Sequence, residues 1–172
     1  TESAGKEQTE DSKPEKTEEN VDEETEATAT EASVGVPISE FVSKYNYMAD
    51  GLSDITKVEQ ITEESVKTGK IVKGNNTVIE LKVNSSDKVY EMKITTESGE
   101  KSATYELLTL IGAFDDSAVE ALDTLTILNK ALNSESSNSK ISYKKTDEGT
   151  KQVLEGTYIS DSEETSGNTQ SN

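Results

Sequence analysis

The chain has 172 residues, which is enough for one domain with extensions. Its 35 acidic residues outnumber 17 basic ones, and the net charge of −18 disfavours DNA, RNA and anionic membrane surfaces as partners. The sequence contains no His, Cys or Trp, and all of its basic residues are Lys, so sites built on imidazole, thiolate or a guanidinium fork are excluded. Carboxylate chemistry, Ser/Lys chemistry or oxygen-only metal binding would remain.

The first segment, residues 1–33, predicts a disordered acidic linker. It holds 12 acidic residues and 3 Lys, a net charge of −9, and Val21 is its only large aliphatic residue. Such a segment cannot bury enough apolar area to offset the entropy cost of ordering its backbone. The last segment, residues 160–172, has three acids and no apolar side chain, and we expect a disordered polar tail. A domain over 34–159 is left, with 20 acids, 14 Lys and a net charge of −6.

A helix is predicted at the start of this domain. Phe41, Tyr45, Met48 and Leu52 follow one another at spacings of four, three and four, which is the helical period. Pro37 and Ser39 are helix start signals, and Gly51 is expected to end the helix in the left-handed cap position.

Several strands are predicted next. Residues 57–62 are a possible strand and 66–73 a better one, followed by a turn at 74–76. Strands over 77–83 and 88–96 flank a second turn at 84–87. The pattern is typical of a meander with one apolar face.

The helical period then returns in two segments. A first stripe of Tyr105, Leu107, Leu108 and Ile111 is expected to end near Gly112. The sequence from Ser117 to Glu120 has the form of a capping box and predicts the start of a second helix. The residues expected on its buried face are Ala118, Ala121, Leu122, Leu125, Leu128 and Leu132.

A polar loop over 133–139 leads to a predicted hairpin of strands 140–146 and 151–159, joined at Asp147–Gly149. The order is therefore one helix, three or four strands, two helices and two strands. This order predicts an α+β fold: an antiparallel sheet of about five to six strands with three helices packed on one side.

Candidate catalytic and metal sites all have simpler structural readings. Asp115, Asp116 and Asp123 lack the alternating spacing of a calcium loop, and capping explains acids near a helix start. The acids Glu59, Glu63 and Glu64 are expected in a solvated loop. Ser98-Gly-Glu-Lys101 matches only the short form of a Ser-x-x-Lys nucleophile motif and falls in a predicted turn. We therefore predict no catalytic residues, no metal ligands and no cofactor.

Tyrosines are the better candidates for a binding role, since Tyr outnumbers Phe six to two and suits interfaces. Tyr45 and Tyr47 lie two positions apart on a helix, so one is expected in the core and the other exposed. The structural alternative is that the tyrosines are half-buried packing residues. The possible partner-binding residues are Tyr45, Tyr47, Tyr90, Tyr143 and Tyr158.

The sequence VPISEFVSKYNYMADGL followed by a β meander, with Phe41 and Lys44-Tyr45-Asn46 as its motif, resembles small uncharacterised surface lipoproteins of low-GC Gram-positive bacteria. Residues 1–33 are similar in style to the spacer that follows the lipidated Cys in such proteins. The resemblance implies an extracellular, membrane-anchored domain whose lipid anchor is not in this chain. A start at Thr1 and not at Met fits the expectation that an N-terminal segment has been removed or left out.

Three functions are compatible with these features. The first is a non-enzymatic, cell-surface domain that binds a protein or peptide through its sheet face or a helix groove, and it does not bind nucleic acid. The second is a secreted enzyme inhibitor of the β-lactamase-inhibitor-like kind. The third is a hydrolase using carboxylates or a Ser/Lys pair, for which a cleft with two facing carboxylates or a Ser–Lys contact would be required.

Overall fold

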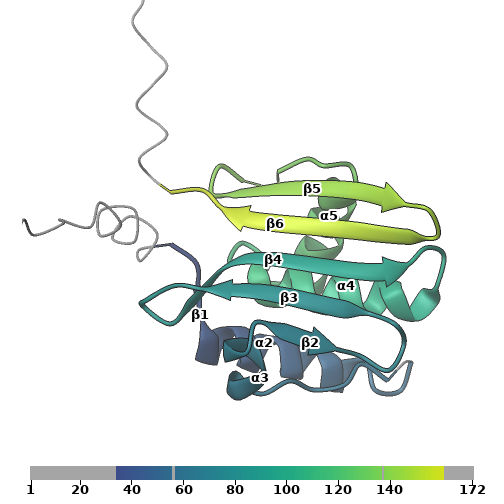
Figure 1. Ribbon diagram of the computed structural model, residues 1–172, viewed down its shortest axis with the longest axis horizontal. Coiled ribbons are helices and arrows are strands. Elements are labelled where there is room, and N and C mark those ends of the chain that lie inside the picture. The colour runs from purple at the N-terminus through teal and green to yellow at the C-terminus, as the bar shows by residue number, and fades with distance from the viewer. Residues whose placement is uncertain (1–33, 56, 137, 161–172) are drawn as a thin grey trace, which may run out of the picture.

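A computed structural model describes residues 34–55, 57–136 and 138–160 (Figure 1). The predictions for 1–33 and for most of the tail lie outside these residues. The helices are α2 (Ile38–Gly51), α3 (Glu63–Lys67), α4 (Lys101–Phe114) and α5 (Ala121–Leu132). The strands are β1 (Val36–Pro37), β2 (Lys70–Val72), β3 (Val78–Val83), β4 (Lys88–Glu97), β5 (Ile141–Glu148) and β6 (Lys151–Tyr158).

The predicted α+β fold is confirmed. Five strands form an antiparallel sheet in the order β2-β3-β4-β6-β5, and β1 adds a short pairing to β4. The helices cover one face of this sheet (Figure 1), and α4 contacts both α2 and α5. The core between the layers includes Phe41, Met92, Ile111 and Phe114, none of which is exposed.

The first helix forms where it was predicted and ends at Gly51, as expected, but the conformation at its end differs. Gly51 is the last residue of α2, the C-cap residue Leu52 has helical dihedral angles, and Gly51 is not among the glycines with positive φ. The prediction of a left-handed glycine cap at Gly51 is therefore wrong. Asn46, which interrupts the apolar positions, donates to the Ile61 carbonyl and accepts from the Ile61 N–H, both at 2.8 Å. This pair of bonds fastens the segment after α2 to the helix.

The two strands predicted over 57–62 and 66–73 are largely wrong. Residues 57–62 form neither helix nor strand, residues 63–67 form α3, and only 70–72 form a strand. The reason is a capping box: Thr62 Oγ1 accepts from the Ser65 N–H, and Ser65 Oγ accepts from the Thr62 N–H. These reciprocal bonds start a helical turn in a segment whose composition also suits a strand.

The central strands follow the predicted meander with one irregularity. Lys82 pairs with Glu91 and Val83 with Val89, so Tyr90 is an extra residue in β4 and forms a β-bulge. The bulge places Val89 on the buried face together with Met92 and Ile94. Without it, the alternation of a strand would put Val89 on the opposite face from Met92.

The second half of the chain has the predicted elements with shifted ends. Helix α4 continues past Gly112 to Phe114, and α5 starts at Ala121 with Glu120 as its N-cap. The predicted capping box of Ser117 is wrong, because the Ser117 hydroxyl instead donates to the buried carboxylate of Asp115 at 2.5 Å.

The final hairpin turns slightly later than predicted. Glu148 pairs with Lys151, so the turn has two residues, Gly149 and Thr150. Gly149 has a φ of 65°, the positive value that the first position of a type II′ turn requires.

Candidate functional site

The five candidate tyrosines fall into two groups. Tyr45, Tyr143 and Tyr158 are buried, and their hydroxyl groups donate to Glu106 Oε2 at 2.6 Å, Asp115 Oδ2 at 2.8 Å and the Phe114 carbonyl at 2.7 Å, respectively. Burial raises the pKa of all three hydroxyls above the ordinary value, and neighbouring carboxylates raise it further. These three residues are packing and hydrogen-bonding groups with little exposed surface, although Tyr158 also lines a shallow surface depression.

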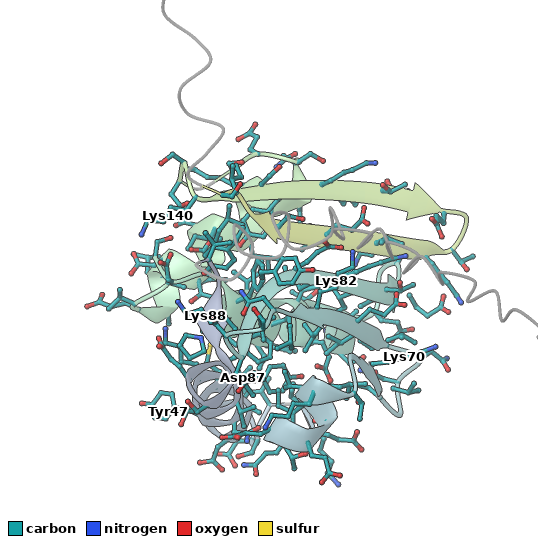
Figure 2. The ribbon with its side chains drawn as sticks, turned by 60° about the vertical axis from the view of Figure 1, so that its left-hand side comes forward. Tyr47, Lys70, Lys82, Asp87, Lys88 and Lys140 are labelled. Carbon is teal, nitrogen blue, oxygen red and sulfur yellow. The ribbon has the colours of Figure 1, made fainter. Side chains whose placement is uncertain are left out.

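The remaining two tyrosines are accessible. The Tyr47 side chain is 82% exposed and projects from α2 away from the body of the molecule (Figure 2). Tyr90 is half-buried and lines a shallow depression with Glu91, Thr157 and Ser160. The expectation that one of Tyr45 and Tyr47 is core and the other exposed is confirmed.

A groove lies between α2 and α5, over the C-terminal half of α4. We call it the α2–α5 groove. It encloses about 310 Å³, at the lower end of the range of about 300–1,000 Å³ for small-molecule sites. Its lining residues are Lys44, Tyr47, Met48, Gly112, Asp116, Ala118, Val119, Glu120, Ala121 and Thr124.

Large apolar side chains are exposed at this groove. Val119, immediately before α5, is 83% exposed and lines it. On α5, Leu122 is 72% and Leu125 is 51% exposed. Leu125 is one helical turn from Ala121, a lining residue, so the apolar surface continues from the groove along α5. Exposed large apolar side chains gathered in one region of the surface are typical of interaction sites.

This surface was missed because the sequence analysis placed Leu122 and Leu125 in the core. The residues of α5 that are buried are Thr124, Ile127, Leu128 and Ala131. The predicted buried face of α5 is therefore wrong at Ala121, Leu122 and Leu125, all of which are exposed. The signal was present as a helix with apolar residues on more than one face.

Carboxylates dominate the charge around the groove. Asp116 pairs with Lys140 at 3.4 Å, and Lys44 pairs with Glu40 at 2.7 Å, so both nearby lysines already have an acidic partner. Glu120 lines the groove, and Asp123 lies in the first turn of α5. Neither of these last two forms an ion pair with any residue in the described part of the chain.

A polar cluster is buried elsewhere, between α2, α4 and the end of β2. Glu106 accepts from the Tyr45 hydroxyl, while Lys73 Nζ lies 5.1 Å from the centre of the Tyr45 ring and donates to the Glu59 carbonyl. Burial raises the pKa of Glu106, an effect that the Tyr45 hydrogen bond and the charge of Lys73 oppose. Burial likewise lowers the pKa of Lys73. Tyr45, Lys73 and Glu106 are all buried, and their polar groups contact one another or the backbone of the described domain.

The acidic candidates have structural roles or lie at the surface. Asp115 is buried and also accepts from the Ser117 N–H at 3.0 Å, which ties the start of the α4–α5 connection to β5 through Tyr143. Glu59 and Glu63 are exposed, and Lys101 is the first residue of α4. Within the ranges that the structure describes, no group of three or more Asp, Glu, His or Cys could hold a metal ion.

The outer face of the sheet carries charges of alternating sign. Strand pairing places one charged residue from each of the five main strands in a single row across the sheet. In order of the strands, the row is Lys70, Glu80, Lys93, Glu155 and Lys144. Beside this row lies an ion pair in which Lys82 Nζ is 2.9 Å from Glu91 Oε1. This face places opposite charges side by side, with Lys93–Glu80 and Lys82–Glu91 as ion pairs, and Val72 at the β2 edge is an exposed apolar residue on it.

No protein family, curated protein or solved structure matches the chain. Among the helices in the described ranges, none is long and apolar enough to cross a bilayer.

Proposed function

We propose that this protein is a non-enzymatic binding domain that holds a protein or peptide partner in the α2–α5 groove. The observation that supports this proposal is the exposure of Tyr47 and Val119, which line a concave, mostly apolar site, together with the exposed apolar residues Leu122 and Leu125 on the neighbouring helix α5. Exposed apolar side chains gathered at a concave site are typical of interaction surfaces, and Tyr is among the residue types that dominate binding energy. The charge-paired sheet face is the less suitable of the two surfaces considered from the sequence.

We further propose that the domain acts outside the cell, tethered to the membrane by a lipid anchor through residues 1–33. The acidic linker composition and the resemblance to surface lipoproteins support this location. Inhibition of a secreted enzyme is one form that the binding could take, since an inhibitor would use the same kind of surface. Labelling of intact cells with a membrane-impermeant reagent tests the location, and protection of the protein until lysis would refute it.

The binding proposal is tested by selecting peptides from a random displayed library on the full chain. Enriched peptides should lose at least about tenfold in affinity on the double variant Tyr47→Ala/Val119→Ala, because each side chain is an exposed contact worth about 1 kcal/mol or more. The matched control is Val72→Ala, since Val72 is 67% exposed but lies on the edge strand β2. Peptides that bind the double variant as well as the wild type, or a selection without enrichment, would refute the proposal.

A further inference from the structure

The α2–α5 groove has features that identify the chemistry of its occupant, and this inference rests on the proposed function. We infer that the occupant is an amphipathic helix with an apolar face and Lys or Arg residues beside that face. The shape, the lining and the charge of the groove each favour this kind of occupant.

The shape suits a helix. The groove has one helix on each side, α2 with Tyr47 and Met48 and α5 with Ala121, while Gly112 of α4 lines it between them. Ala121 is a small, exposed lining residue, and small residues let a second helix approach to the usual distance of about 8–10 Å between axes. An added helix would extend the helical layer in the way that amphipathic segments occupy grooves, with apolar anchors at spacings of three, four and seven.

The lining suits apolar anchors of varied shape. Met48 has an unbranched, polarisable side chain that adapts to the group packed against it. Val119 adds exposed apolar area within the groove and Leu125 adds it one helical turn beyond Ala121, so a partner can contact two or more turns of helix. A volume of about 310 Å³ is enough for anchor side chains but small for a large cofactor.

The charge selects basic flanks. Glu120 and Asp123 are exposed at the α5 end of the groove, and the lysines nearby are already paired with Glu40 and Asp116. An acidic helix would add like charges here, and so would the acidic segment 1–33 of this chain. A symmetric second copy would bring its own Glu120 and Asp123 to the same surface, which disfavours self-association through it.

The test measures the affinity of the full chain for three dye-labelled helical peptides by fluorescence anisotropy. The first peptide has Leu anchors on one face and Lys beside them, the second has Glu in place of Lys, and the third has the Lys of the first with its Leu residues distributed around the helix. We expect the first peptide to bind most tightly. Its affinity should fall with added salt, and Glu120→Gln should lower it about two- to fivefold. Val119→Ala should lower this affinity further than Glu120→Gln does, and Val72→Ala should leave it unchanged.

The same experiment distinguishes failure of the inferred occupant from failure of the groove as a binding site. If the Glu peptide binds as tightly as the Lys peptide and both depend on Val119, the charge inference is overturned while the groove remains a binding site. If the third peptide binds as tightly as the first, attraction to the acidic chain alone explains the signal and the inference is overturned. If no peptide binding depends on Val119, the proposed function itself is refuted. Self-association of the chain that Val119→Ala abolishes would replace the helix with a second copy as occupant.

Discussion

Gly112 offers a direct test of how closely α2 and α4 pack beneath the groove. It lies inside α4, where glycine is less favourable than alanine by about 1 kcal/mol. A Cβ at this position would overlap Met48 Sδ of α2, come within 3.0 Å of Met48 Cε and lie 3.5 Å from Thr124 Cγ2. Gly112→Ala must therefore displace the Met48 side chain, which lines the groove.

The expected magnitude comes from two opposing terms. Overpacking of a filled interior costs about 1–3 kcal/mol, and the flexibility of methionine favours the lower part of this range. The gain in helix propensity, about 1 kcal/mol, offsets part of that cost. We expect Gly112→Ala to lower the free energy of unfolding by between about 0 and 2 kcal/mol.

Gly51 provides the matched control. It is also a helical glycine, its φ is not positive, and a Cβ there would meet no atom within 4 Å. Gly51→Ala should raise the free energy of unfolding by up to about 1 kcal/mol. Urea unfolding followed by circular dichroism gives both values from midpoints at constant m.

A double-mutant cycle isolates the contact. Met48→Ala removes the overlapping atoms, so Gly112→Ala should be stabilising in that background, with a coupling energy of about 1–3 kcal/mol between the two sites. Strict additivity would refute the packing argument. Gly112→Ala alone should also weaken the binding of any peptide whose affinity depends on Val119. The displaced Met48 side chain would move into the groove, because that is the open space beside it.

Three further predictions concern buried or half-buried polar groups. Tyr143→Phe should cost about 1–3 kcal/mol of unfolding free energy and Tyr158→Phe about 0.5–1.5 kcal/mol, since the first hydroxyl binds a carboxylate and the second a carbonyl; the reverse order in urea unfolding would contradict this. Asn46→Ala removes both bonds to Ile61 and should cost about 1–2 kcal/mol, with faster amide exchange at Ile61, which an unchanged exchange rate would disprove. Because burial raises the pKa of Glu106 above 4.5, the native state binds its proton more tightly than the unfolded state, so this group favours folding below 4.5 and the contribution is lost as pH rises through the raised value. The stability of Glu106→Gln relative to wild type should therefore increase with pH above 4.5, at no more than about 1.4 kcal/mol per pH unit; a decrease would show that the charged form is the stabilised one.

The sequence was sufficient for the elements whose signals are local. The spacing of Phe41 and Tyr45 predicts α2, and the turns at 74–76 and 84–87 delimit β3, because periodicity and turn chemistry depend only on neighbouring residues. It failed where two local signals compete. Residues 57–73 contain β-branched residues typical of strands, but the hydrogen bonds between Thr62 and Ser65 stabilise the helix α3 in this segment.

Side-chain roles were harder to predict than elements. Ser117 has the pattern of an N-cap, but its hydroxyl donates to Asp115, whose carboxylate is held in the interior by the Tyr143 hydroxyl of β5. The buried tyrosines could not be separated from the exposed Tyr47 by composition, because burial is set by which face of an element meets the sheet. Periodicity identifies a helix without fixing its rotation when apolar residues occupy more than one face.

That ambiguity in α5 is itself informative. On the outer face of the sheet, the chain places Lys and Glu at alternating positions such as Glu80, Lys93 and Glu155, so its solvated surfaces are made polar and charge-paired. Helix α5 instead keeps Leu122 and Leu125 exposed, although neither packs into the core of the described domain. A hydrophobic contact outside the chain would explain these residues, and α5 also supplies Ala121 and Thr124 to the α2–α5 groove, where such a contact would form.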